Sequence, residues 1–440
     1  MAEQAAVYDC RMSAWSATPL SSFAMLAFRL DNLTHLVRAY GEGVRPRAVD
    51  FVHGMLRDAV GSRAVVDRSV DGLVSTVILD PGLFGGRDMS EASCAQFVRD
   101  FGARVAAVPF TFEGVDLHVA VSGAWSLTND VQADPHLEAS GEILRARLSD
   151  VRFIGEPSAA GADWVRRYKA DMARASWLLS AMSHGRLLPV WQPVRSGCVE
   201  DTVLYHEALL RVLDDGQQVS AGEAIGALER LGLVEMIDRH GVERVIEELR
   251  RDPDVCLAVN ISAQSAWLSP WWSEVAEQLR RDPDLASRLI VEVTETAQFR
   301  DMGQAVTLVA CLRKLGVRVA LDDFGVGHAS LRSLLALQPD IIKIDAFFLR
   351  RAIGSEPDRV ALHHLIGLAG SFVADVVVEG VETEEEFDLA REAGAIWLQG
   401  YHMGRPSVVR PWFKDAVQTN VLALFEKRQA YREAGWSVPG

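Results

Sequence analysis

The sequence predicts an α/β protein in which a TIM-type (β/α)8 barrel follows a smaller α+β domain. Its 440 residues are too many for one ordinary hydrophobic core, so two domains are expected. From about residue 171 onward, short apolar runs alternate with amphipathic segments of helix length, which is typical of a barrel built from strand–helix units. Residues 20–127 instead mix strands, a hairpin and helices, which favours a compact α+β domain.

The first domain is assigned to residues 20–127, and a linker to residues 128–170. Strands are predicted at Phe23–Leu30 and Gly72–Leu79, with a hairpin that pairs Val108–Thr111 with Leu117–Ser122 across Glu113 and Gly114. Helical spacing of apolar residues predicts helices at Ala48–Val60 and Ala92–Ala106. The linker is polar and interrupted by proline, and we expect it to be helical around Leu137–Leu148 and Ala162–Ser176.

The barrel domain is assigned to residues 171–410, and apolar runs predict its strands. They are Leu187–Pro193, Thr202–Leu210, Cys256–Ile261, Leu289–Val293, Arg318–Leu321, Ile341–Ile344, Val376–Val378 and Ile396–Leu398. Only a short stretch that begins at Arg195 separates the first two runs. That is the spacing of a hairpin, so the first strand should run antiparallel to the second. Residues 411–440 are expected to form a terminal helix, Trp412–Arg428, and a loose tail.

Composition and charge exclude several classes of protein. Apolar residues make up 49% of the chain and charged residues 24%, which is globular composition rather than disorder. The formal charge of -15 argues against a DNA or RNA polymer as partner, because such surfaces carry clustered Lys and Arg. Neither a signal peptide nor a membrane-spanning run is expected. The five cysteines are too scattered for a zinc site or a disulfide framework, so we expect a cytoplasmic protein with reduced thiols.

Polar side chains follow the barrel strands at the points where the strands end. They are Glu207, Asn260, Glu292, Asp322, Asp323, Lys343, Asp345, Glu379 and Gln399. A barrel brings these ends to one rim, where barrel active sites lie. One such acid is more often solvated, but two carboxylates ~4 Å apart repel by roughly 4 kcal/mol, so a ring of them requires cations or raised pKa values. Oxygen ligands of this kind suit Mg²⁺, Mn²⁺ or Ca²⁺, and with a nearby lysine they indicate metal-assisted hydrolysis of a phosphodiester.

The same residues belong to seven ordered motifs. They are Glu207-Ala208-Leu209-Leu210-Arg211, Val259-Asn260-Ile261-Ser262, Glu292-Val293-Thr294-Glu295, Asp322-Asp323-Phe324-Gly325, Lys343-Ile344-Asp345, Glu379-Gly380-Val381-Glu382-Thr383 and Gln399-Gly400-Tyr401. In order and content they resemble the EAL family of cyclic di-GMP phosphodiesterases, over about residues 175–410. The resemblance implies an EAL-type modified TIM barrel with an antiparallel first strand.

The resemblance also implies two ions of Mg²⁺ or Mn²⁺ per active site. The implied ligands are Glu207, Asn260, Glu292 and Asp322 for the first ion, and Asp322, Asp323 and Glu379 for the second. Glu207, Asp323, Lys343 and Glu379 are the implied catalytic residues, with Lys343 orienting the attacking water or touching the phosphate. Implied at the substrate are Arg211, Gln192 in Trp191-Gln192-Pro193, and Gln399, which would order the surroundings of the second ion. Glu295, Asp345 and Glu382 would support the site.

Simpler structural roles remain as alternatives for several of these residues. Glu295 and Glu382 are as well explained as loop struts, and Asp345 as a helix cap. The family mechanism needs no histidine, so His206 and His328 are interpreted as bystanders. The family usually has Trp at Val212, and Tyr and Ser at His328 and Ala329, but these departures remove no metal ligand.

The implied reaction is hydrolysis of cyclic di-GMP to linear pGpG, by in-line attack of water on one phosphorus with the 3′ oxygen leaving. Two other functions are a non-catalytic receptor that binds cyclic di-GMP, and a protein-interaction scaffold. Receptors of this kind typically lack the EAL glutamate or one of the paired aspartates, whereas this chain keeps Glu207, Asp322 and Asp323. A scaffold has no reason to keep the acidic ring. The enzyme is therefore the expected function.

Residues 20–127 resemble a GGDEF domain, the cyclase fold that often precedes an EAL domain, in a degenerate form. Val70-Asp71-Gly72-Leu73-Val74 replaces the Gly-Gly-Asp-Glu-Phe motif, and Arg29 replaces a metal-binding aspartate although Asp31 remains. Val37 and Pro46 stand where residues that contact guanine are usual. Cyclase activity is therefore not expected. The domain is interpreted as regulatory or dimerising, and a homodimer is expected.

Overall fold

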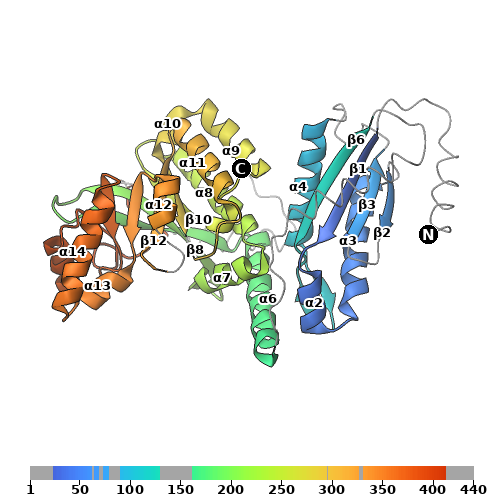
Figure 1. The fold of residues 1–440 in the computed structure, drawn as a ribbon, viewed down its shortest axis with the longest axis horizontal. Helices are drawn as coiled ribbons and strands as arrows, with labels where there is room; N and C mark the ends of the chain where they lie inside the picture. The colour runs from blue at the N-terminus through green and yellow to red at the C-terminus, as the bar shows by residue number, and fades with distance from the viewer. Residues whose placement is uncertain are drawn as a thin grey trace. The chain divides into compact units, whose positions relative to one another are not determined.

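The computed structural model describes residues 23–61, 64–68, 73–78, 90–128, 161–294, 296–326 and 331–412. The predicted helix Leu137–Leu148, nearly all of Trp412–Arg428, and the residues Glu295 and His328 lie outside these ranges. The chain divides into two compact units, Met1–Tyr168 and Lys169–Gly440 (Figure 1). The division falls within one helix, α6 (Ala162–Ser183), which is longer than predicted. Within the described ranges, no helix is both long and hydrophobic enough to cross a bilayer.

The first unit is built on an antiparallel sheet with the strand order β2-β3-β1-β6. Its strands are β1 (Phe23–Leu30), β2 (Ala64–Arg68), β3 (Leu73–Ile78) and β6 (Val121–Thr128). Its helices are α2 (Leu33–Tyr40), α3 (Val44–Val60) and α4 (Glu91–Ala107). Helix α3 packs along β2 and β3, and α4 packs along β6 and β1. This arrangement confirms the predicted α+β domain.

The predicted hairpin of this unit is wrong in its extent. Two short strands, β4 (Phe110–Phe112) and β5 (Val115–Leu117), form a separate two-stranded sheet. Glu113 and Gly114 between them have positive φ angles of 49° and 78°, which close a tight two-residue turn. The chain then leaves this pair, and β6 joins the main sheet beside β1. The strand β2 and the helix α2 are not among the predicted elements, because each is too short to show a clear hydrophobic period.

The second unit contains the eight predicted barrel strands. They are β7 (Leu187–Ser196), β8 (Val203–Asp214), β10 (Leu257–Ser262), β11 (Leu289–Thr294), β12 (Arg318–Phe324), β13 (Ile341–Ile344), β14 (Asp375–Val378) and β15 (Trp397–Leu398). The sheet closes because β8 pairs with β10 and β15 pairs with β7. Strand β7 runs antiparallel to both neighbours, which confirms the prediction from the short connection. A further strand, β9 (Gln217–Ser220), extends the sheet beyond β8.

Helices pack around the barrel strands (Figure 1). They include α7 (Gly222–Leu231), α8 (Glu235–Arg251), α9 (Pro270–Arg281), α10 (Pro283–Arg288), α11 (Met302–Lys314), α12 (Leu331–Leu337), α13 (Ala346–Ala352), α14 (Glu356–Gly370) and α15 (Glu384–Glu392). The core between strands and helices includes Trp271 and Trp272, both buried. A separate apolar layer fills the barrel interior: Val194, Tyr205, Ala258, Ile290, Ala320, Ile341 and Val377. With its interior filled, the barrel offers a ligand its rim rather than a central channel.

Candidate active site

The polar rim lies one side-chain layer beyond the apolar layer inside the barrel. Along a strand, side chains i and i+2 point to the same face. On six strands, a residue of the apolar layer is followed two positions later by a predicted rim residue. The pairs are Tyr205 and Glu207, Ala258 and Asn260, Ile290 and Glu292, Ala320 and Asp322, Ile341 and Lys343, and Val377 and Glu379. The barrel therefore brings these rim side chains together at the C-terminal ends of its parallel strands.

Asp323 joins the rim through an irregularity in β12. A regular strand would point Asp322 and Asp323 to opposite faces. The pairing of β12 with β13 shifts register between Leu321 and Phe324, and Asp323 has a φ of 56°. Positive φ is uncommon outside glycine, but aspartate is enriched among the residues that adopt it. The bulge thus turns both carboxylates toward Glu379, with ligand oxygens of the three residues within 4.8 Å of one another.

Lys343 lies at the centre of the acidic rim and is only 1% exposed. Its Nζ lies 3.1 Å from Glu207, 2.8 Å from Glu292, 3.3 Å from Asp322 and 2.8 Å from Glu379. Burial lowers the pKa of Lys343, but the carboxylates outweigh burial and hold this pKa well above its ordinary value. Lys343 is therefore charged at neutral pH. One ammonium faces four carboxylates, so the rim keeps an excess of acidic groups.

The rim carboxylates resist ionisation because they are buried together. Burial raises the pKa of Glu292 to about 8 and that of Asp323 to about 7. The pKa values of Asp322 and Glu379 are raised as well, with burial again the largest cause. Glu207 differs: burial raises its pKa, but the rim lysine and two amide hydrogen bonds outweigh burial and bring the pKa below its ordinary value. The rim therefore needs either bound protons or further cations at neutral pH.

Two groups of described carboxylates are close enough together to hold metal ions, and they share a residue. One is Glu207, Glu292 and Asp322, and the other is Asp322, Asp323 and Glu379. Near the first group, the buried oxygens Asn260 Oδ1 and Glu292 Oε1 have no hydrogen-bond partner. Such an oxygen is costly to bury, and a hard divalent cation would satisfy it. The donor set therefore fits two oxygen-liganded ions that share Asp322, an arrangement suited to phosphodiester chemistry.

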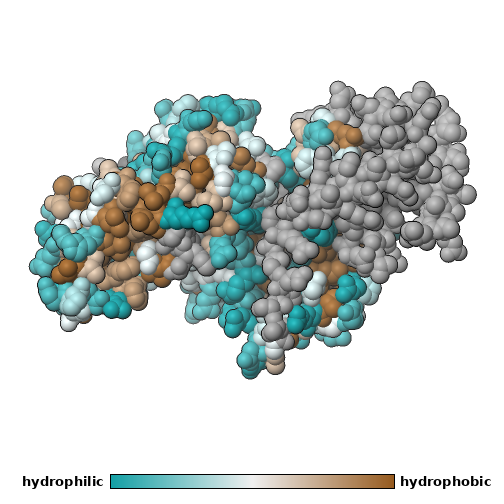
Figure 2. Space-filling view, in the orientation of Figure 1, coloured by the Kyte–Doolittle hydropathy of each residue, from teal (hydrophilic) through white to brown (hydrophobic). Residues whose placement is uncertain are grey.

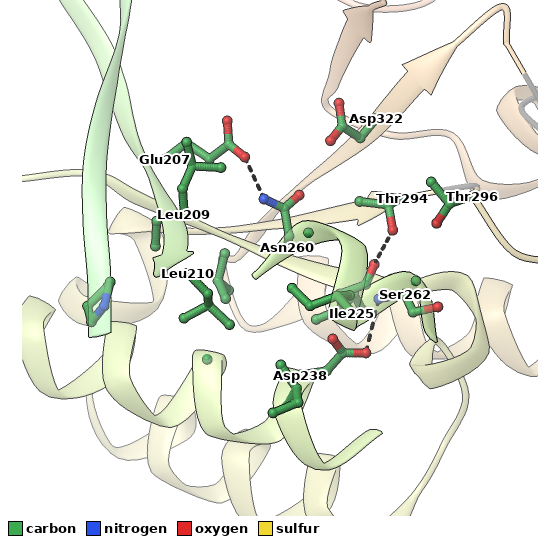
Figure 3. A pocket seen from close by; sticks show the side chains of 18 of the residues that line it. Glu207, Leu209, Leu210, Ile225, Asp238, Asn260, Ser262, Thr294, Thr296 and Asp322 are labelled. Atoms are coloured by element: carbon green, nitrogen blue, oxygen red, sulfur yellow. Dashed lines mark hydrogen bonds between the residues drawn. The ribbon is translucent and has the colours of Figure 1, made fainter. Parts of the chain in front are cut away.

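A pocket of about 510 Å³ opens beside the first group of carboxylates (Figure 3). The residues that line it include Glu207, Asn260 and Asp322 from the rim, and Arg211 from the same strand as Glu207. In Figure 3 the side chains of Glu207 and Asn260 point toward one another, and Asn260 Nδ2 donates to Glu207 at 2.5 Å. The guanidinium of Arg211 is anchored by donation from Nη1 to the Leu210 carbonyl at 3.0 Å. The volume is in the range of small-ligand pockets.

The two predicted substrate glutamines lie next to Glu207. Gln192 pairs with Glu207 across β7 and β8, and its Nε2 donates to the Gly404 carbonyl at 3.1 Å. Gln399 Nε2 donates to Glu207 Oε2 at 2.5 Å. Gln399 thus orders a carboxylate of the first group, whereas the family resemblance implied the surroundings of the second ion.

The supporting acids lie at the edge of the site. Asp345 caps α13, because its Oδ1 accepts a hydrogen bond from a backbone N–H of that helix at 2.8 Å. Glu382 forms an ion pair with an arginine of α13 at 3.4 Å. Glu295 is outside the described residues. His206 faces away from the rim: its ring centroid lies 4.9 Å from that of Trp412, and burial lowers its pKa to about 4.

Two buried acids at the pocket wall are absent from the predicted site. Glu229 of α7 and Asp238 of α8 are 8% and 5% exposed. Asp238 accepts the backbone N–H of Ser262, at the end of β10, with a distance of 3.0 Å (Figure 3). Both acids stand on the buried faces of amphipathic helices. An acid at an apolar position of a helical pattern is the signal that would have found them, because buried carboxylates need partners.

Comparison with known proteins identifies the same part of the chain as the barrel and its rim. Residues 175–406 match the family model described as the EAL domain. The cyclic di-GMP phosphodiesterase PdeF of Escherichia coli K12 is 30% identical over 252 residues, which cover 56% of this chain and 33% of that protein. An uncharacterized signaling protein of Caulobacter vibrioides is 29% identical over 313 residues, which cover 69% of this chain and 38% of that protein.

Among solved structures, the S helix-GGDEF-EAL region of Vibrio cholerae LapD in its apo form covers 90% of this chain and 93% of its own. Its sequence identity is 17% and its TM-score is 0.48. The chain spans about a third of the length of the two curated relatives, at 33% and 38%.

Proposed function

The chain belongs to the EAL domain family, and from this premise we propose that its barrel is a metal-dependent phosphodiesterase that hydrolyses cyclic di-GMP to linear pGpG. The observation that carries the proposal is the pair of carboxylate groups that share Asp322, beside a pocket and a buried lysine. The related PdeF is itself named a cyclic di-GMP phosphodiesterase. Buried acids are costly without partners, so a rim of this kind is well explained by ions that it binds.

The proposed ions are two of Mg²⁺ or Mn²⁺. Glu207, Asn260, Glu292 and Asp322 would hold one of them, and Asp322, Asp323 and Glu379 the other. When bound, such ions neutralise the charge of a phosphate and lower the pKa of water to ~7. Carboxylate and amide oxygens are the ligands that both metals prefer.

The chain's own residues position the substrate around that centre. Lys343 supplies a fixed positive charge and donates an N–H to the attacking water or to a phosphate oxygen. Arg211, at the pocket wall, donates to a phosphate oxygen of the substrate. Gln399 keeps Glu207 in place through its hydrogen bond, and Gln192 lies beside the same carboxylate. Attack opens one phosphodiester bond in line, and the 3′ oxygen that leaves takes up a proton.

The supporting acids act on the segments that carry these groups. Asp345 caps α13 directly after the strand of Lys343, so it fixes the end of that strand. Glu382 ties the segment after Glu379 to the same helix. Glu295 completes the proposed set as the anchor of the loop after Asp323.

The test is turnover by the purified full chain. We expect cyclic di-GMP to give pGpG on chromatography with Mg²⁺ or Mn²⁺, and no product with EDTA. The matched inactive variant is Glu207→Gln, which keeps the shape of the side chain but removes its charge. We expect this variant to have no turnover. Tight binding of cyclic di-GMP without turnover under both metals would contradict the enzyme and establish a receptor.

The proposal extends to the first unit as a degenerate GGDEF-like domain without cyclase activity. Arg29 forms an ion pair with Asp31 at 2.8 Å, so the remaining acid of the expected metal site is occupied by an arginine. A metal ion and a guanidinium compete for the same carboxylate. The ion pair therefore supports a regulatory role for this domain rather than nucleotide chemistry.

Helix α6 belongs partly to each unit and makes side-chain contacts within both of them. Near its start, Trp164 and Tyr168 stack with ring centroids 5.0 Å apart, and both rings lie beside His35 of α2. One turn later, Asp171 accepts two hydrogen bonds from Arg230 of α7, each 2.8 Å long.

A homodimer is also part of the proposal. Leu331 and Leu335 of α12 and Phe347 of α13 are 46%, 56% and 48% exposed. Figure 2 shows hydrophobic surface in the region of these helices. Large apolar side chains gathered on a surface are typical of a protein interface. The described cysteines are free thiols, which supports the cytoplasm as the proposed location.

A further inference from the structure

Glu229 joins two segments that leave the metal rim. Its carboxylate accepts a hydrogen bond from Ser262 Oγ at 2.6 Å and from Thr296 Oγ1 at 2.9 and 3.1 Å. Its backbone carbonyl accepts a hydrogen bond from a third residue, Gln264, whose Nε2 lies 3.0 Å away. Ser262 ends β10, and Thr296 follows β11. One buried side chain of α7 therefore holds the ends of two neighbouring barrel strands.

These two strands carry ligands of the same proposed ion. Asn260 of β10 and Glu292 of β11 are paired in register, and each has a buried oxygen without a hydrogen-bond partner. Ser262 lies two residues after Asn260, so the two side chains share a face of the strand. Asp238 holds the backbone N–H of Ser262 at 3.0 Å. Two acids, Glu229 and Asp238, thus fix the end of β10. The side-chain oxygen of Asn260 on the same strand remains available to the proposed ion.

The helix that carries Glu229 is itself anchored. The adjacent residue, Arg230, donates from Nε and Nη2 to the two oxygens of Asp171, both at 2.8 Å. Asp171 is buried, and a bidentate arginine–carboxylate pair restricts both partners. Glu229 is therefore a rigid support rather than a mobile surface acid.

We propose that Glu229 is a positioning residue for metal binding, which holds the ends of β10 and β11 so that Asn260 and Glu292 reach the same ion. The inference rests on the proposed metal-dependent function. Ligand geometry must hold within about 0.5 Å for a site to work, and residues that support the ligands supply that constraint. The side chain of Glu229 hydrogen-bonds to Ser262 and Thr296, so it acts on the proposed ligands through these two residues.

Three variants of the full chain separate positioning from general stabilisation. Glu229→Ala removes the acceptor for both hydroxyl groups. Glu229→Gln keeps the shape, accepts from one hydroxyl and donates to the other. The matched control is Glu223→Ala, because Glu223 is an acid of the same helix whose side chain is 88% exposed.

The measurement is the dissociation constant of Mn²⁺, from calorimetry and from the electron paramagnetic resonance signal of free Mn²⁺, with thermal unfolding in EDTA alongside. We expect Glu229→Ala to weaken Mn²⁺ binding by about 10- to 100-fold, the range found for residues that support metal ligands. Glu229→Gln and Glu223→Ala should stay within about threefold of the wild type. A purely structural role would lower the unfolding temperature without moving the dissociation constant of the folded fraction.

Two outcomes would overturn the inference in distinguishable ways. If the wild type binds Mn²⁺ and Glu229→Ala binds it equally well, the positioning role is wrong while the proposed function stands. If the wild type binds no Mn²⁺, the proposed function fails and this role fails with it. Should Glu229→Ala not fold, the double variant Ser262→Ala, Thr296→Val removes the same two hydrogen bonds from the other side, and the same shift is expected.

Discussion

Replacing Lys343 by methionine removes the one charged amine at the centre of the rim while keeping the length of the side chain. The Nζ of Lys343 is 2.8–3.3 Å from four carboxylates, and the side chain is 1% exposed. At ~3 Å and an effective dielectric of ~20, one ion pair contributes roughly 5.5 kcal/mol before desolvation. Burying the ammonium costs several kcal/mol, which offsets much of that attraction. The net effect is therefore much smaller than the sum of the pairs.

The loss of one partner from a buried pair typically costs ~3–5 kcal/mol. The lower end applies here, because burial raises the pKa of Glu292 to about 8 and protonation of the rim relieves part of the repulsion. A loss of ~3 kcal/mol in a domain of this size lowers the unfolding temperature by roughly 6–12 °C. We expect that drop for Lys343→Met in EDTA, measured by differential scanning fluorimetry at pH 7.

Mn²⁺ should stabilise Lys343→Met more than it stabilises the wild type, because the ion no longer competes with the ammonium for the carboxylates. A ligand at 100 times its dissociation constant contributes ~2.7 kcal/mol, which is close to the loss. Turnover should still fall by a factor on the order of 10², as is usual when electrostatic help is removed. The control is Lys314→Met, at an exposed lysine of α11. An unchanged unfolding temperature in EDTA, or near-normal turnover, would refute this reasoning.

Three further predictions concern single residues. Asp322→Asn should weaken both Mn²⁺ sites in a calorimetric titration, because Asp322 belongs to both carboxylate groups, whereas Glu379→Gln should weaken one; equal loss in the two variants would contradict the shared ligand. Burial raises the pKa of Asp238 to about 7, so the stability that its protonated form contributes is full below about pH 4 and is lost as the pH rises through 7. Asp238→Asn should therefore reduce the loss of unfolding free energy between pH 5 and 8 by about 3 kcal/mol in urea titrations, and an unchanged dependence of that free energy on pH would count against it. The full chain should form no cyclic di-GMP from GTP, because the carboxylate of Asp31 is paired with Arg29 instead of being available to a metal ion. Any such product would show that this ion pair opens.

Much of the rim could be predicted because its cause is local. In the barrel strands, an apolar residue is followed two positions later by a polar one, and strand geometry alone places both on one face. That pattern holds at Glu207, Asn260 and Glu292 without any knowledge of the partner strands. Asp323 is different, since its orientation depends on the bulge in β12 and on a positive φ. Its place just after a predicted strand and within a motif, not its period, marked Asp323 in the sequence.

The errors in the first unit have the opposite cause. The strand β2 and the helix α2 are short, and what defines them is pairing with β3 and packing on α3. The hairpin prediction extended its second strand to Ser122, into the start of β6, because the sequence shows the turn at Glu113 and Gly114 but not the sheet that β6 joins. Short elements take their structure from tertiary contacts, which a single sequence does not display.

The two acids that support the rim, Glu229 and Asp238, were not predicted because they lie on helices rather than on barrel strands. Every proposed metal ligand lies on or directly after a barrel strand, whereas the groups that fix the end of β10 come from outer helices, Glu229 from α7 and Asp238 from α8. Strand periodicity determines which side chains face the rim, but it does not determine the exact positions of their ligand oxygens. That last adjustment depends on α7, and α7 is tied through Arg230 to Asp171 of α6. In the proposed positioning role, α7 therefore links Asp171 of α6 to the end of β10 through Arg230 and Glu229.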